Sequence, residues 1–277
     1  ETTADHHHDR LEDLEEAAEE LRRHASRSLG SVLEGWLPDL KWLIIIALLS
    51  GGLMMSLMAQ QENIASAEPQ RRLTEARDAL LGFAAANGRL PCPASPASTG
   101  TENPVGGGAC ANAWDGFLPA ITLGLTPSNE NGYAIDGWGN PIRYAVTTYS
   151  HATFCANSCF TTSNGIKTAW NASVGALVLA PDLRVCNTAT GLTGAGATAA
   201  CAAGSDLANN AVATVYSRGK NGAAAPASAD EQANGDADRL FVSHTPSPTG
   251  ANEFDDLVIW LSPNILYNRL IAAGRLP

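Results

Sequence analysis

The spacing of apolar residues changes along this chain, and each spacing predicts a different element. From residue 9 to residue 33, apolar side chains recur at mostly heptad spacing, which predicts an amphipathic helix. Residues 42–59 contain no ionisable side chain, and a helix of that length reaches about 27 Å, close to the thickness of the hydrocarbon core of a bilayer. The second pattern therefore predicts a transmembrane helix.

Helical periodicity returns after Pro69 and continues to Asn87 and Gly88, where a helix end is expected. Because proline inside a helix loses a hydrogen bond, we expect a break near Pro69. Together these segments predict a long, interrupted helical stem over residues 40–86. The stripe expected to lie on a sheet consists of Leu73, Ala76, Leu80, Phe83 and Ala84.

After the stem, short runs rich in β-branched and aromatic residues alternate with Gly, Asn and Pro, which predicts strands and turns. The expected strands are residues 142–149, 174–180, 212–217 and 254–261. Ser262 and Pro263 then predict the start of a final helix that closes at Gly274. Residues 187–211 and 222–239 are poor in apolar side chains and are expected to be long loops.

These elements predict an α+β fold, in which a long N-terminal transmembrane helical stem packs on an antiparallel β-sheet head with long disulfide-bonded loops. Three parts are expected: an acidic amphipathic helix (1–38), the transmembrane and stem helix (39–88) and the globular head (89–277). Within the apolar segment, small residues leave one flank nearly bare and favour close helix packing; a plain anchor is the alternative. The residues expected to pack are Trp42, Ser50, Gly51, Gly52 and Ser56.

Charge and cysteine content narrow the function classes. The net charge is −11, and ten acidic residues against four arginines give −6 over residues 1–36 alone. A chain this acidic, without a basic stripe, is a poor candidate for binding nucleic acid. All the cysteines follow the apolar segment, which is typical of an oxidising compartment on that side.

Fifteen disulfide pairings are possible, and we favour the sequential one because each bond then closes a short loop that lacks apolar residues. The favoured pairs are Cys92 with Cys110, Cys155 with Cys159, and Cys186 with Cys201. His151 with Cys155 and Cys159 also has spacing that a zinc site could use, although a disulfide is the stronger expectation.

Three motifs in the second half of the chain carry a family resemblance. They are the Asp136-Gly-Trp-Gly-Asn-Pro141 turn, the Ser217-Arg-Gly-Lys-Asn-Gly222 turn and the closing segment Asp255-Asp-Leu-Val-Ile-Trp260. In this order and spacing, the chain resembles the type IV pilin and type II secretion pseudopilin superfamily over about residues 40–277, and the major pseudopilins most. The stretch from Ala79 to Pro93 is similar to a bacterial branch of pilin-like proteins.

The resemblance implies a calcium site in the loop between residues 222 and 254. The position that matches the family's acidic ligand is Asp256, whereas Asn221 stands where the preceding turn usually carries an aspartate. The inserted loop itself contains Asp230, Glu231, Asp236, Asp238 and Glu253, and oxygen ligands of this kind suit a hard cation. A solvated loop without a metal is the alternative.

The front of the chain departs from the family pattern. About forty residues precede the apolar segment, which contains no glutamate, so the usual prepilin processing is not expected. The resemblance implies a structural subunit of an extracellular pilus-like filament that polymerises with identical copies, resides in the inner membrane before assembly and then lies at the cell surface.

Two alternatives remain. One is a non-polymerising, membrane-anchored component of a secretion or pilus-assembly machine, and the other is a surface-anchored adhesin or binding protein. An enzyme is not expected, because the chain has neither a G-x-S-x-G elbow nor a phosphate-binding loop.

Overall fold

The computed structural model describes residues 68–172, 179–247 and 252–277. The chain divides into two compact units, Glu1–Asn63 and Ile64–Pro277, and the description below concerns the second. Several expectations lie outside the described residues: the amphipathic helix of residues 9–33, the apolar segment 42–59 and most of the predicted strand 174–180. The five residues expected to pack between helices, Trp42, Ser50, Gly51, Gly52 and Ser56, also lie outside them.

The first described helix covers residues 68–87 and carries one apolar stripe. Leu73, Ala76, Leu80 and Ala84 are almost completely buried, whereas Arg71 and Glu75 on another face are exposed and form an ion pair of 2.7 Å. This spacing of three and four residues is what packs a helix on a sheet while its other side faces water. The predicted stripe is therefore confirmed at these four positions.

The expected fold, with a transmembrane helical stem on the sheet, is wrong for the part of the chain that the structure describes. The helix that packs on the sheet, residues 68–87, is amphipathic and charged. Across the described residues, no helix combines the length and the apolar character that crossing a membrane requires. The physical reason is the exposed charged face, because each ionised side chain would lose its hydration in hydrocarbon.

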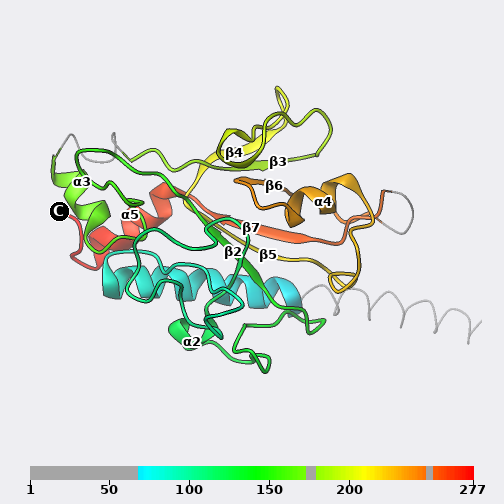
Figure 1. Ribbon diagram of the computed structural model, residues 1–277, viewed down its shortest axis with the longest axis horizontal. Helices are drawn as coiled ribbons and strands as arrows, with labels where there is room; N and C mark the ends of the chain where they lie inside the picture. The colour runs from blue at the N-terminus through cyan, green and yellow to red at the C-terminus, as the bar shows by residue number, and fades with distance from the viewer. Residues whose placement is uncertain (1–67, 173–178, 248–251) are drawn as a thin grey trace, which may run out of the picture. The chain divides into compact units, whose positions relative to one another are not determined.

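The described strands form two sheets, where a single antiparallel sheet was expected (Figure 1). The larger one has the order β1-β2-β5-β7 with all neighbours antiparallel, and the smaller one has the order β4-β3-β6, with β3 and β6 parallel. The strands are β1 (Gly116–Phe117), β2 (Arg143–Val146), β3 (Leu183–Cys186), β4 (Asp206–Ala211), β5 (Ala213–Ser217), β6 (Leu240–Val242) and β7 (Leu257–Leu261).

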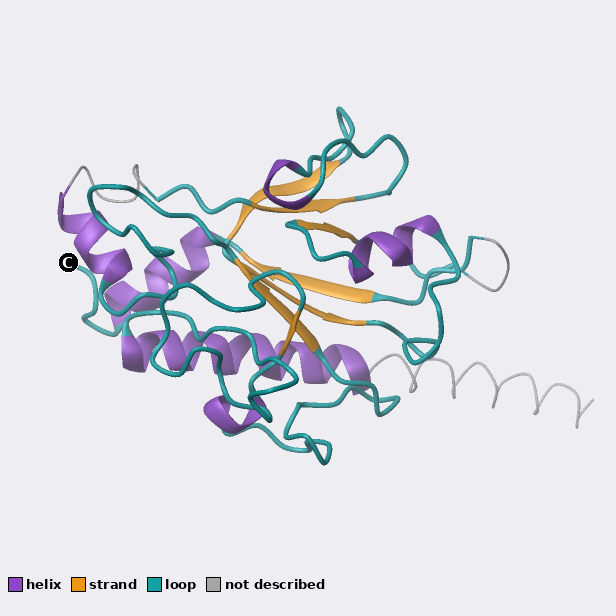
Figure 2. Ribbon diagram, in the orientation of Figure 1, coloured by secondary structure: helices purple, strands orange, loops and turns teal. Residues whose placement is uncertain are grey.

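Short helices and long loops connect these strands (Figure 2). The helices are α2 (Ala120–Leu123), α3 (Gly165–Ala172), α4 (Ala229–Gly235) and α5 (Pro263–Ala272), with one 3-10 turn at Gly196–Thr198. The predicted final helix is confirmed as α5: Ser262 is its N-cap residue, Pro263 stands in its first turn, and Gly274 with φ +69° follows its end. Strand β4 and helix α4 lie within the segments that were expected to be loops.

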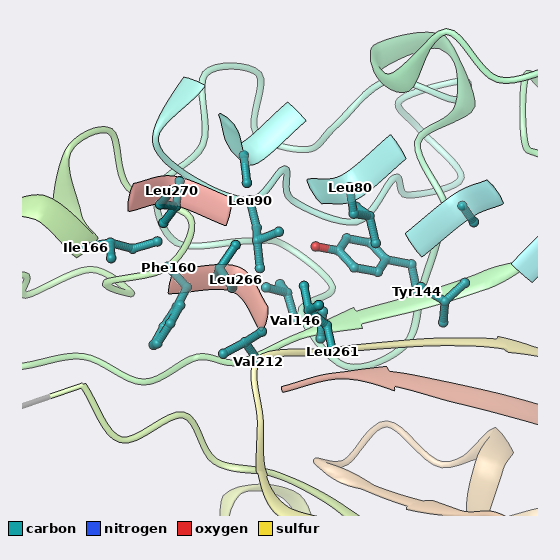
Figure 3. Packing of buried hydrophobic residues seen from close by; sticks show 14 of the residues in the cluster. Leu80, Leu90, Tyr144, Val146, Phe160, Ile166, Val212, Leu261, Leu266 and Leu270 are labelled. Atoms are coloured by element: carbon teal, nitrogen blue, oxygen red, sulfur yellow. The ribbon is translucent and has the colours of Figure 1, made fainter. Parts of the chain in front are cut away.

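Both faces of the larger sheet are buried, and the alternation of side chains shows how. Tyr144 and Val146 in β2 and Val215 in β5 belong to the cluster that includes helix 68–87 and α5 (Figure 3). Their neighbours Ala145 and Tyr216 point the other way and pack with residues of the smaller sheet. Since successive residues of a strand face opposite sides, β2 and β5 are apolar at consecutive positions.

Three disulfides hold the loops, and they are the sequential pairs that the loop argument favoured: Cys92–Cys110, Cys155–Cys159 and Cys186–Cys201. Because both candidate thiol ligands are oxidised, the zinc alternative at His151 is wrong. His151 instead stacks on Phe154, with ring centroids 4.5 Å apart.

Candidate metal centre

The three motif segments converge at one end of the larger sheet. Strand β5 ends at Ser217 and leads into the turn of residues 217–222, and strand β7 begins just after Asp255 and Asp256. Helix α4 contacts both through Glu231, which bonds to Asn221 and to the Asp255 backbone. Helix α4 starts where the Ser228 hydroxyl accepts a hydrogen bond from the Glu231 backbone N–H at 3.3 Å, which is an ordinary N-cap. Glu231 thus stands in the first turn of α4.

Glu231 is 3% exposed and forms the centre of the arrangement. Its carboxylate accepts hydrogen bonds from the backbone N–H groups of Ala227 at 2.7 Å and Asp255 at 3.2 Å. The side-chain amide of Asn221 donates to the same carboxylate at 3.2 Å. A buried carboxylate is thus linked to three separate segments of chain.

Asp255 occupies the gap between the turn and α4. Its Oδ2 atom accepts from the backbone N–H groups of Lys220 at 2.8 Å and Asn221 at 3.3 Å, whereas its Oδ1 atom is buried without a hydrogen-bond donor. A Cβ atom on Gly219 would lie 1.8 Å from Oδ1, and Gly219 has φ +64°. Only glycine therefore allows the turn to pass this close to the carboxylate.

Asp256 is 3% exposed and accepts a hydrogen bond from the Asn234 side chain at 2.8 Å. Burial raises the pKa of Asp256 to about 7; the charges of Glu231 and Asp255 add to this, while the Asn234 hydrogen bond and the Arg218 charge act against it. Burial also raises the pKa of Asp255, against the hydrogen bonds from Asn221 and Lys220. The ionised forms of both aspartates are thus disfavoured here.

One carboxylate oxygen from each of Glu231, Asp255 and Asp256 lies within 4.8 Å of the other two. Among the described residues, none of the three forms an ion pair with Arg, Lys or His. Calcium binds six to eight oxygen ligands at about 2.3–2.6 Å, with carboxylates prominent among them. The donor set, its burial and the unpaired Asp255 Oδ1 atom fit a calcium ion, whose charge would offset the repulsion between the three carboxylates.

The turn of residues 217–222, which contacts Asp255, is itself held by the distant turn of residues 136–141. Asp136 accepts hydrogen bonds from the backbone N–H groups of Trp138 at 2.9 Å and Asn140 at 2.8 Å, and from the Ser217 hydroxyl at 2.5 Å. The Asn140 side chain donates to the Gly219 carbonyl at 2.8 Å. The Trp138 turn therefore positions the 217–222 turn, which in turn contacts Asp255.

The two residues predicted for the calcium site have different positions in the structure. Asp256 belongs to the cluster as expected, but Asn221 donates its amide N–H groups to Glu231, so it positions a ligand in this geometry. Sequence reasoning named Glu231 among the loop acids without singling it out, and it did not name Asp255 as a ligand. The signal that could have singled out Glu231 is the Ser228-x-x-Glu231 spacing, which predicts a helix start with the glutamate in its first turn.

The other loop acids lie outside the cluster. Asp230 pairs with His244 at 3.1 Å, and Asp238 accepts from the Leu240 backbone N–H at 2.8 Å. Asp236 and Glu253 are not part of it.

No protein family, curated protein or solved structure matches this chain.

Proposed function

We propose that this chain is a structural subunit of an extracellular filament of the pilin-like kind, with the unit Ile64–Pro277 as its head. Contacts between identical subunits come from the N-terminal part of the chain, which includes the uncharged segment 42–59. Residence in the inner membrane before assembly and a place on the cell surface afterwards belong to the same proposal.

The observation that supports this function best is the connection between the motif turns. The three segments that carry the resemblance, at Asp136, Ser217 and Asp255, are far apart in the sequence, yet hydrogen bonds connect them in one network. Helix 68–87 packs on an antiparallel sheet beside them, and disulfides hold the loops. A rigid, crosslinked head of this kind suits a subunit that is exposed outside the cell.

In this proposal, calcium is a structural ion and not a catalytic one. When bound, it supplies positive charge between Glu231, Asp255 and Asp256. The chain's own residues do the rest: Asn221 orients Glu231, and Gly219 lets the turn approach Asp255. The ion would then hold α4 to the end of the larger sheet.

Electron microscopy of filaments sheared from the source cell tests the proposal. We expect regular fibres that contain this polypeptide, identified by antibody labelling and by mass spectrometry of the fibre fraction. Recovery of the polypeptide only from the inner-membrane fraction, with no fibres, would contradict it and favour a non-polymerising component of a secretion or pilus-assembly machine.

A further inference from the structure

Residues of the segment 109–115 line two cavities, and Ala113 lines both. The first has a volume of about 250 Å³ and the second about 220 Å³. Asn112, Trp114 and Asp115 line the first cavity. The second has a mixed lining, in which Ala109, Cys110, Ala113 and Ala156 stand beside the polar residues Thr147, Thr148, Ser150, Asn157 and Ser158. The cavities are therefore neighbours that share Ala113, and Ala237, which follows α4, completes the lining of the first.

The walls of the second cavity are held rigidly. The Cys92–Cys110 disulfide ends at one wall, and the Cys155–Cys159 disulfide encloses the residues of another. Ser158 has φ +51°, which is unusual for a residue with a side chain, and its hydroxyl accepts from the Thr161 hydroxyl at 2.9 Å.

The common wall is anchored as well, because the Val146 backbone N–H in β2 donates to the Ala113 carbonyl at 2.8 Å. A surface that is already built loses little conformational entropy when it binds a ligand.

The lining has almost no charge. Asp115 is its one ionisable residue, and this carboxylate forms an ion pair with Arg143. Hydroxyl and amide groups, which can both donate and accept hydrogen bonds, make up most of the polar surface. This chemistry disfavours an ionised ligand and suits a neutral molecule that carries many hydroxyl groups.

Trp114 contributes an aromatic side chain to the lining of the first cavity. The residue is half-buried, with part of the indole packed against the core cluster between the sheets. Sugar rings present an apolar C–H face and a rim of hydroxyls, so an aromatic ring beside amide and hydroxyl groups matches both. Each cavity is smaller than the roughly 300–1,000 Å³ of a drug-sized site, which suits one ring in each.

We propose that the surface around residues 109–115 binds a neutral oligosaccharide, with one sugar ring in each cavity. Asn112 and Trp114 contact the ring in the first cavity, and Thr148, Ser150 and Asn157 contact the ring in the second. This inference goes beyond the proposed filament, since a single subunit carries the whole surface.

Binding is tested with the full chain in a zwitterionic detergent that contains no sugar. The probes are an array of neutral di- to tetrasaccharides of glucose, galactose, mannose and N-acetylhexosamines, with sialylated and sulfated counterparts; hits are titrated by calorimetry. We expect at least one neutral probe to bind with a Kd of about 1 mM or lower. No binding by any neutral probe, or tighter binding of the acidic counterparts, overturns the proposal.

Two variants locate the site. Asn112→Arg fills the first cavity and Ser150→Arg the second, while Ser163→Arg adds the same side chain at an exposed position outside both. Each cavity variant is expected to weaken binding about tenfold or more, and the control to leave it unchanged. Unchanged binding in both cavity variants overturns the proposed location.

Should either arginine variant unfold, Ser150→Ala and Thr148→Val serve instead, each with an expected loss of about threefold to tenfold. An unchanged Kd in both of these substitutes equally overturns the location. Because binding is measured on dispersed subunits and filaments are measured by microscopy, failure of this proposal is distinguishable from failure of the proposed function.

Discussion

Two regions of this unit bury carboxylates, and they differ in what balances the charge. Near the end of helix 68–87, Glu102 is 5% exposed and forms two hydrogen bonds of 2.7 Å with the Arg89 guanidinium. Burial acts to raise the pKa of Glu102, but the Arg89 hydrogen bonds, the backbone N–H groups of Gly106 and Cys92 and the Arg89 charge lower it overall.

At the candidate metal centre, Asp256 is buried to a similar degree, and its pKa is raised to about 7. Burial alone therefore does not decide the charge state of a carboxylate in this fold. A fixed cation inside the fold keeps Glu102 ionised, whereas the cluster of Glu231, Asp255 and Asp256 has no such partner among the described residues. The charge of Glu102 is already balanced inside the fold, whereas a bound cation would stabilise the cluster of three carboxylates.

Removing the internal cation should have the largest effect. In Arg89→Met, Glu102 is buried without its partner, so we expect a loss of roughly 3–5 kcal/mol in the free energy of unfolding. Chemical denaturation of the full chain measures it. Arg71→Met, at an exposed ion pair that water screens, is the control, and its loss should be much smaller. Equal losses in the two variants would show that the buried Arg89–Glu102 pair contributes no more to stability than an exposed pair.

The pH dependence of stability should differ between the regions. Because the pKa of Asp256 is higher in the folded chain than in the unfolded one, its contribution is most favourable below about pH 4 and is lost as the pH rises to about 7. A shift of this size corresponds to roughly 4 kcal/mol.

Denaturation of the wild type and Asp256→Asn between pH 4 and pH 8, with a chelator present, measures this contribution. We expect the wild type to lose stability relative to the variant as the pH rises. A difference that stays constant across this range would contradict the unbalanced charge of Asp256.

Bound calcium should restore much of the stability that the fold loses when Asp256 ionises. At a free concentration one hundred times its Kd, an ion that binds only the folded chain adds about 2.7 kcal/mol to stability, and the melting temperature should rise accordingly. Glu231→Gln should abolish most of the rise, whereas Asp236→Asn, an exposed acid near α4, should leave it intact. A similar rise in both variants would show that calcium binds elsewhere.

The smallest expected effect concerns the glycine that the cluster requires. Gly219→Ala combines a positive φ with a contact against Asp255, so we expect a loss of about 2–3 kcal/mol. Gly204→Ala has a positive φ of 82° with open space around it, and its loss should be about 1 kcal/mol. Equal losses would mean that the approach to Asp255 costs nothing.

Helix 68–87 and α5 illustrate what local sequence predicts well. Each has a recognisable end, and both ends agree with the structure. The stripe of helix 68–87 is buried, but in α5 the expected stripe is only half right: Leu266 and Leu270 are buried, whereas Ile265 and Ile271 are exposed. The disulfide loops were predictable for a related reason, since a short polar loop between two cysteines has little else to hold it.

The spacing of apolar residues did not predict β4 and α4, because the segments that hold them are distant in the sequence. Strand β4 is mostly exposed and polar, and it forms because β3 pairs with it. Helix α4 is short and its sequence is mostly small and polar; it forms where Ser228 caps it and Asn234 bonds to the Val242 backbone. The Ser228 cap is visible in a window of neighbouring residues, but the pairing of β4 with β3 and the bonds of Asn234 to the Val242 backbone are not.

What the sequence determined by itself is the set of local choices: an amphipathic helix at residues 68–87, consecutive apolar residues in β2 and β5, glycine at the tight turns and cysteines at loop ends. Only the tertiary structure decided that β2 and β5 are covered on both faces, and that Glu231 and Asp255 join Asp256. The reason is physical: periodicity records which side of an element avoids water, whereas a cluster of charges arises from contacts between segments whose separation in the chain carries no local signal.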